Sequence, residues 1–93
     1  MINQKIKKIR RKLDKLDDKM LLIIKKRSIL VDQILSNKTK KKQIVDKKRI
    51  SLILKNIRKK SLRKKIDPKI TKNIWVSMIR AFVNYEYRNF KKK

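Results

Sequence analysis

The sequence contains no Cys, no His and no Gly, and it has one Pro in 93 residues. Without Cys there is no disulfide framework and no thiolate nucleophile. Without His there is no histidine base and no usual zinc site. The shortage of Gly and Pro leaves little turn chemistry, which favours an all-helical chain with short connections. We therefore expect one domain, residues 1–93, that uses neither a metal nor a cofactor.

Long apolar runs are missing as well. No apolar segment approaches the 18 or so residues that a membrane-spanning helix needs. The N-terminus also lacks the apolar block of a signal peptide. We therefore expect no association with a membrane and a soluble, cytoplasmic protein.

The charge is strongly one-sided, with a formal net charge of +25. Such an excess of cations is typical of proteins that bind nucleic acid or an anionic surface, but a compositional bias towards lysine gives the same number. The lysines fill nearly every polar position on all predicted faces, and aromatic residues make up 5% of the chain. We therefore expect nucleic acid to bind only weakly and non-specifically, and a basic nucleic-acid-binding helical dimer remains an alternative.

Apolar residues recur at spacings of three and four through residues 2–38. They are Ile6, Ile9, Leu13, Leu16, Met20, Ile23, Leu30 and Ile34. This heptad pattern predicts one long helix, about residues 3–36, with a continuous apolar seam. The helix would span about 50 Å, whereas a compact domain of this size is roughly 30 Å across. We therefore expect an obligate, intertwined homodimer in which this helix crosses into the partner subunit.

Two further helices follow. Asp46 is a suitable N-cap for a helix of about residues 46–64. Asp67 and Pro68 mark the start of a third, about residues 68–90, because Pro is favoured at the first helical position. The residues expected to face inward are Ile50, Ile53, Leu54, Ile57, Leu62, Ile70, Ile74, Trp75, Met78, Ile79, Phe82 and Val83. The predicted fold class is all-α, with three helices per subunit.

Several charged residues occupy positions that the pattern reserves for apolar ones. Arg27 stands in the seam, and Lys38 faces the same way, into the interface, since 11 residues of helix return to nearly the same face. A buried cation is costly unless a carboxylate or an anionic ligand pairs with it. Arg10 lies about 25 Å along the helix from Arg27, so in an antiparallel dimer Arg10 of one chain can approach Arg27 of the other.

The later helices carry similar residues. Asp46 and Arg49 lie beside the apolar face of the second helix, and Glu86 continues the apolar stripe of the third, four residues after Phe82. Any one of them alone is more typical of a structural ion pair or of a side chain whose charged end reaches solvent. Together, with cations in excess, they predict a pocket for a small polyanion.

These residues match a known pattern. The segment 9–21, I-R-R-K-L-D-K-L-D-D-K-M-L, is followed by Lys26 and Arg27. It resembles the opening helix of the all-helical (type II) chorismate mutases, roughly L-R-x-x-I-D-x-L-D-x-x-I/L-L with a later arginine. The Asp46-x-x-Arg49 start of the second helix and the Ile-Asp start of the third also fit. The resemblance covers nearly the whole chain. It implies an intertwined dimer that converts chorismate, a dicarboxylate, to prephenate without a cofactor.

The resemblance also implies roles for single residues. Arg10, reaching in from the partner subunit, and Arg27 correspond to the arginines that hold the two carboxylates of the substrate. Lys38 corresponds to the lysine that bonds the enolpyruvyl ether oxygen and a carboxylate. Glu86 falls where the family has Gln or Glu, on the other side of that oxygen. The implied catalytic residues are therefore Lys38 and Glu86.

The ring end of the implied site departs from the family pattern. Asp46 and Arg49 match the pair at the start of the second helix, near the substrate ring. The family often has Glu after this arginine, where the chain has Ile50, and a small polar residue on the third helix, where it has Phe82. These changes bear on recognition of the ring hydroxyl and on catalytic efficiency. The nearest alternative is an isochorismate–pyruvate lyase of the same fold, and another is an inactive, mutase-like regulator.

Overall fold

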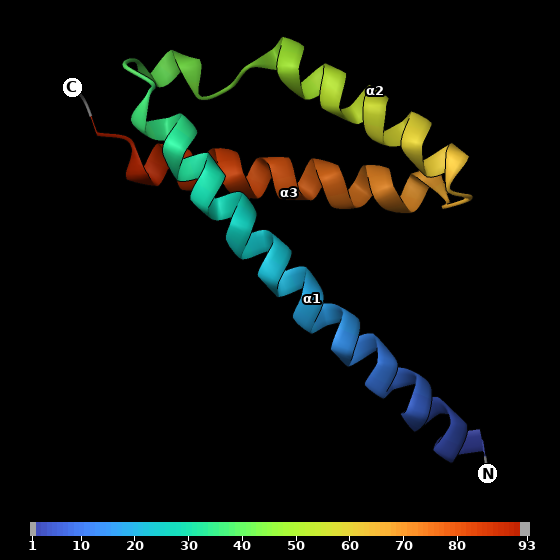
Figure 1. Ribbon diagram of the computed structural model, residues 1–93. Coiled ribbons are helices and arrows are strands. Elements are labelled where there is room, and N and C mark those ends of the chain that lie inside the picture. The colour runs from blue at the N-terminus through green and yellow to red at the C-terminus, as the bar shows by residue number, and fades with distance from the viewer. Residues whose placement is uncertain (1, 92–93) are drawn as a thin grey trace. The chain divides into compact units, whose positions relative to one another are not determined.

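The computed structural model describes residues 2–91, so Met1 and residues 92–93, the ends of the predicted domain, lie outside the described residues. Figure 1 shows the order of the elements: α1 (Ile2–Ser36), the short 3₁₀ helix η1 (Lys41–Gln43), α2 (Lys47–Arg63) and α3 (Pro68–Asn89). The described residues contain no strand. The predicted all-α class is confirmed. None of the helices in the described part of the chain is long and apolar enough to cross a bilayer.

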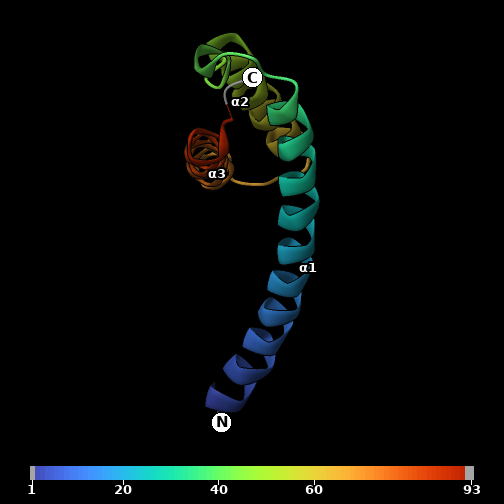
Figure 2. The same ribbon diagram turned by 90° about the vertical axis from the view of Figure 1, so that its left-hand side faces the viewer.

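The chain divides into two compact units, Met1–Val31 and Asp32–Lys93. The described part of the first unit is an uninterrupted run of α1, which Figure 2 shows as a single helix. The seam side chains of this run are exposed, for example Ile9 at 58%, Leu16 at 52% and Ile23 at 57%. The N-terminal unit by itself therefore offers nothing against which its apolar seam could pack.

The second unit contains a helical hairpin of α2 and α3, which pack against each other (Figure 1). Each helix starts at a capping aspartate. Asp46 Oδ1 accepts a hydrogen bond from Arg49 N at 3.0 Å, and Asp67 Oδ1 accepts one from Lys69 N at 2.9 Å. Pro68 occupies the first helical position of α3. Both predicted N-caps are confirmed, because a short carboxylate satisfies amides that the helix itself cannot.

A tight turn connects the two helices. Lys65 adopts a left-handed conformation with φ of 57°, and Ile66 N bonds back to Ser61 O at 2.9 Å. This arrangement closes the C-terminus of α2 and normally uses Gly. The chain has no Gly, so a lysine takes the strained position.

The contact between α2 and α3 includes a buried pair of hydroxyl groups. Ser61 Oγ lies 2.7 Å from Thr71 Oγ1 and 2.6 Å from Ile57 O. Ser61 Oγ donates to Ile57 O, and Thr71 Oγ1 also lies 3.3 Å from Pro68 O, to which it can donate. Leu62 and Ile70, which the sequence predicted to face inward, are 54% and 55% exposed. Adjacent helical positions are about 100° apart, so the residues next to the hydroxyl pair point outward.

Ile74, also predicted to face inward, is 44% exposed. All the other positions of α2 and α3 that were predicted to face inward are half-buried. They are Ile50, Ile53, Leu54, Ile57, Trp75, Met78, Ile79, Phe82 and Val83. The hairpin alone therefore leaves much of the apolar surface of its helices only partly covered.

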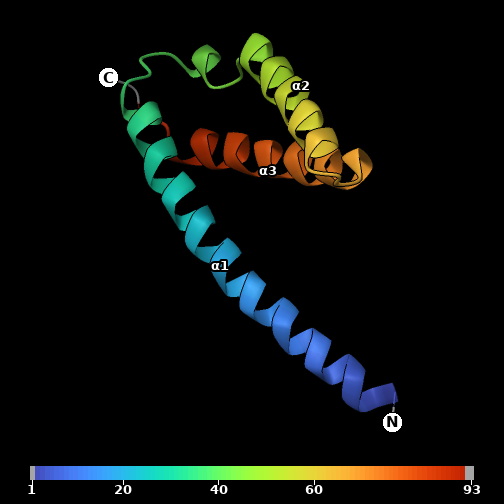
Figure 3. The same ribbon diagram turned by 45° about the vertical axis from the view of Figure 1, so that its right-hand side comes forward.

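The segment between α1 and α2 (Figure 3) begins where two side chains compete for one carbonyl group. Ser36 Oγ and Asn37 Nδ2 both donate to Gln33 O at 2.8 Å. Lys38 N bonds to Leu35 O at 3.0 Å, which tightens the last turn into 3₁₀ geometry. Lys38 therefore lies two residues beyond the helix. The helical register from Arg27 does not fix its direction, contrary to the spacing argument.

Candidate active site

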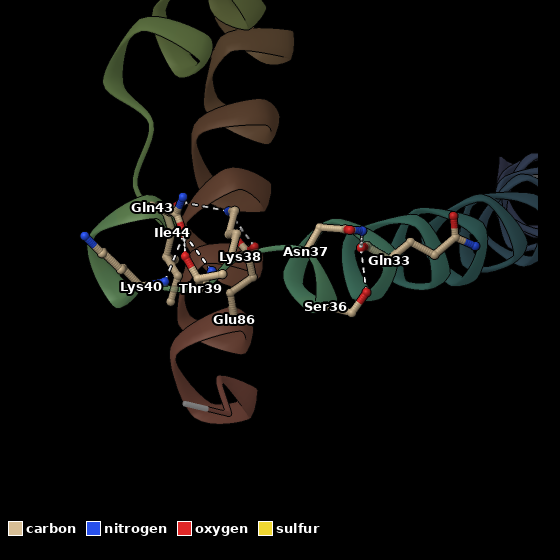
Figure 4. Close-up of polar contacts among 9 residues, drawn as sticks. All are labelled: Gln33, Ser36, Asn37, Lys38, Thr39, Lys40, Gln43, Ile44 and Glu86. Atoms are coloured by element: carbon tan, nitrogen blue, oxygen red, sulfur yellow. Dashed lines mark hydrogen bonds and ion pairs between the residues drawn. The ribbon is translucent and has the colours of Figure 1, made fainter. Parts of the chain in front are cut away.

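The second unit contains an ion pair between two residues that the sequence analysis singled out. Lys38 Nζ donates to Glu86 Oε1 at 2.8 Å, across 48 positions of sequence (Figure 4). The side chains are 17% and 9% exposed, so both charges are largely removed from water. Lys38 Nζ also lies 3.5 Å from Ile44 O. An ammonium group has three N–H donors, so these two contacts leave one for a ligand.

The side chain of Gln43 organises the backbone that carries Lys38. Its Oε1 accepts hydrogen bonds from Thr39 N at 2.7 Å and from Lys40 N at 2.9 Å, and Thr39 Oγ1 lies 3.4 Å away (Figure 4). The sequence pattern did not predict a role for Gln43. A Gln that reaches back to the amide at a helix start is a known capping device, but it normally accompanies Ser or Thr at the cap. Here Lys40 occupies the cap, which obscures the signal.

Asp46 and Arg49 also come together, but through the backbone of Arg49. The Asp46 carboxylate accepts from Arg49 N, and both residues are exposed at the start of α2. Asp46 follows Ile44 by two residues, and Ile44 is 3% exposed. The buried Ile44 therefore anchors a segment that leads from the Lys38 contact directly into the capped start of α2.

The two arginines of the predicted site lie in the N-terminal unit. Arg10 and Arg27 are both on α1, 17 positions apart, which corresponds to about 25 Å of helix. The helix of one chain therefore does not bring them to the same small ligand. Ile50 and Phe82, the two positions that depart from the family pattern, are half-buried apolar residues of α2 and α3.

Another polar contact, which the sequence pattern did not predict, lies beside Glu86. Tyr85 Oη donates to Asp32 Oδ1 at 2.6 Å and so joins the last turns of α1 to α3. This hydrogen bond raises the pKa of Tyr85 above its ordinary value of 10.0, because the neutral phenol is the donor. Desolvation and the negative charge of Asp32 act in the same direction. The residues are 53 positions apart, and no local pattern links them.

The chemistry available at the ion pair is electrostatic. Lys38 presents a positive charge and a spare hydrogen-bond donor in a setting with little water. Donors held in place in this way stabilise negative charge that develops on an oxygen atom during a reaction. A protonated Glu86 could do the same, because a carboxylic acid can accept from Lys38 at one oxygen and donate from the other.

Comparison with known proteins identifies a family. The family model described as chorismate mutase type II matches residues 9–87. The matched range includes Arg10, Arg27, Lys38, Asp46, Arg49 and Glu86. No curated protein and no solved structure matches the chain.

Proposed function

The chain belongs to the type II chorismate mutase family, and on this premise we propose that it catalyses the Claisen rearrangement of chorismate to prephenate. The product would serve the biosynthesis of phenylalanine and tyrosine. The observation that carries the proposal is the family match over residues 9–87, which includes all six residues of the predicted site. The reaction is unimolecular and needs a shaped, charged pocket, which is what these residues can supply.

Binding is the first task of such a pocket. The enolpyruvyl side chain must fold over the ring before the new carbon–carbon bond can form. Arg27 and Arg10 of the partner subunit would each clamp one carboxylate, and a bidentate guanidinium fixes both position and orientation. Holding the substrate in this reactive conformer lowers the entropic part of the barrier.

Charge stabilisation is the second task. Negative charge grows on the ether oxygen as the carbon–oxygen bond breaks, so a donor there favours the transition state over the substrate. Lys38 would give its remaining N–H to that oxygen. Glu86 in its acid form would donate from the other side and still accept the 2.8 Å bond from Lys38.

The ring end of the pocket would be less polar than is usual in the family. Asp46 and Arg49 would lie near the ring, with Ile50 and Phe82 at positions that often carry polar side chains. An apolar residue there cannot hydrogen-bond the ring hydroxyl. We expect weaker discrimination between chorismate and analogues that lack this hydroxyl.

The proposed enzyme is an obligate homodimer. The support is the exposed seam of α1, where side chains such as Leu13 and Met20 are 53% and 50% exposed in the single chain. A heptad seam of this length is stable when a second helix covers it. The same association would bring Arg10 of the partner subunit to the pocket, so the site would be incomplete in one chain.

The direct test is to identify the product. Purified protein is incubated with chorismate and, separately, with isochorismate. We expect loss of the chorismate diene absorbance with formation of prephenate. Salicylate and pyruvate from isochorismate, without prephenate from chorismate, would instead identify a lyase. No turnover of either substrate would indicate a binding protein or an inactive relative and would contradict the proposal.

A further inference from the structure

Residues 37–46 connect α1 to α2 and carry Lys38. Four lysines fall within five residues of this segment, namely Lys38, Lys40, Lys41 and Lys42. Like charges at such spacing repel one another and favour an expanded, mobile loop. A loop of this kind would not by itself hold one particular ammonium group on a buried carboxylate.

The Gln43 amide oxygen opposes this tendency. It accepts hydrogen bonds from the backbone N–H groups of Thr39 at 2.7 Å and Lys40 at 2.9 Å (Figure 4). These are the two residues directly after Lys38. On the other side, Lys38 N is bonded to Leu35 O at 3.0 Å. The backbone of Lys38 is therefore fixed both before and after the residue.

Ile44, the residue directly after Gln43, is also fixed in place. Ile44 N bonds to Lys41 O at 3.0 Å, and its side chain is 3% exposed. Its carbonyl oxygen faces Lys38 Nζ at 3.5 Å. Gln43 thus joins a fixed backbone at Thr39 to a buried anchor at Ile44, and Lys38 Nζ reaches Glu86 beside that anchor.

From this geometry we infer that Gln43 is a positioning residue for Lys38: by holding the amides of Thr39 and Lys40, it keeps Lys38 Nζ on Glu86 and aimed at the reacting oxygen. The catalytic part of the inference rests on the proposed function. The amide oxygen of Gln43 bonds to the backbone N–H groups of Thr39 and Lys40 and to Thr39 Oγ1. Gln43 therefore acts through Lys38, and its contribution disappears when Lys38 is absent.

Two substitutions of Gln43 separate its acceptor oxygen from its bulk. Gln43→Met keeps a side chain of similar length but removes the acceptor, whereas Gln43→Glu keeps an acceptor and strengthens it. Gln33→Met, the same change at an exposed position of α1, is the matched control. We expect Gln43→Met to lower kcat about tenfold, since small misplacements of a reacting group are costly. KM should change less, because the arginines hold the carboxylates.

The Gln43→Glu variant and the double variant with Lys38→Met distinguish positioning of Lys38 from a general effect on loop stability. Gln43→Glu and Gln33→Met should stay within about twofold of the wild type. In a Lys38→Met background, Gln43→Met should have no further effect on the residual rate, because residues that act through one group are not additive. Wild-type rates in folded Gln43→Met, loss of turnover in folded Gln43→Glu, or an additive double variant would each overturn the inference.

A measurement without turnover keeps this test separate from the proposed function. Ammonium protons of a lysine held in a hydrogen-bonded ion pair exchange slowly enough to give a ¹⁵N–¹H signal, and Lys38→Arg identifies the signal of Lys38. It should persist in Gln43→Glu and Gln33→Met and vanish in Gln43→Met. An unchanged signal in Gln43→Met would overturn the inference even if the wild type converts chorismate. A wild type without mutase activity would contradict only the proposed function, and the signal would then decide on Gln43.

Discussion

The Glu86 side chain is largely buried, and its Oε1 lies 2.8 Å from Lys38 Nζ. A hydrogen-bond donor at this position would stabilise the negative charge that grows on the ether oxygen. We therefore predict that Glu86→Gln, a permanent donor of similar shape, keeps substantial turnover, whereas Glu86→Ala lowers kcat by about a hundredfold, the usual cost of losing one such donor. The measurement is kcat of the two folded variants beside the wild type. Wild-type turnover in Glu86→Ala would show that Glu86 does not face the oxygen.

Tyr85 provides a pH-dependent group that can be followed without turnover. Its hydrogen bond to Asp32 raises its pKa, so the bond stabilises the folded state below the ordinary value of 10.0. That stabilisation is lost as pH rises through the raised pKa. The chain has two tyrosines, so the tyrosinate absorbance of the wild type minus that of Tyr85→Phe gives the titration of Tyr85. The midpoint should lie above 10.0 and fall in Asp32→Ala. A midpoint that Asp32→Ala leaves unchanged would exclude the bond in solution.

The predictability of single residues from the sequence depended on whether a helix carries them. Glu86 was identified from its place on the stripe of α3, because helical spacing fixes direction. Lys38 was singled out by extending the helical register of α1, but the helix ends at Ser36. The contact of Lys38 with Glu86 therefore depends on loop hydrogen bonds that helical spacing does not reveal. Gln43 was missed for the same reason. Its role arises from backbone amides gathered by a folded loop.

The helices α2 and α3 begin at matching aspartate caps with different expected roles. Asp67→Ala should lower the stability by about 1 kcal/mol, the usual cost of losing an N-cap. For a domain of this size, that corresponds to a fall of about 4–8 °C in Tm. Turnover below Tm should be unaffected, since Asp67 belongs only to the cap. Thermal unfolding with kcat/KM measures both effects. A variant that melts like the wild type would show that this cap contributes little.

Asp46 should behave differently because it is both a cap and a proposed substrate contact. Asp46→Asn keeps a good cap and removes the charge, so its Tm should stay close to that of the wild type. Its kcat/KM should fall if Asp46 contributes to the pocket. Unchanged kinetics in Asp46→Asn would assign Asp46 to the cap alone.

Most helix boundaries could be predicted from the sequence because their signals are local. The Asp-Pro start of α3 and the Asp start of α2 each depend on neighbouring residues. The end of α1 was harder to predict, because the polar stretch that contains it has no Gly to mark a stop. There the side chains of Ser36 and Asn37 both bond to Gln33 O. The outward positions of Leu62 and Ile70 were not predictable. They follow from the hydroxyl pair of Ser61 and Thr71, ten residues apart, which only the packed hairpin brings together.

Assembly is the property of the whole molecule on which the proposed site depends. Leu16 lies in the middle of the exposed seam. A buried carboxylate there would be very costly, so Leu16→Asp should unfold the chain instead of giving a helical monomer. Circular dichroism and sedimentation check this, with Leu21→Asp, an exposed position next to the seam, as the control. A wild type that sediments as a compact monomer at micromolar concentration would contradict the dimer.

We propose that two subunits build one chorismate mutase site, with Arg27 from one chain and Arg10 from the other. Arg10→Ala and Arg27→Ala should each abolish turnover as folded dimers. A hybrid dimer of the two variants has one site with both changes and one site with neither.

The most direct measurement is therefore the loss of chorismate absorbance after the two variants are unfolded together and refolded as an equimolar mixture. Random pairing makes about half of the dimers hybrids, each with one intact site, so the mixture should recover about a quarter of the wild-type rate. A mixture as inactive as each variant refolded alone would show that Arg10 and Arg27 do not serve one site across the interface.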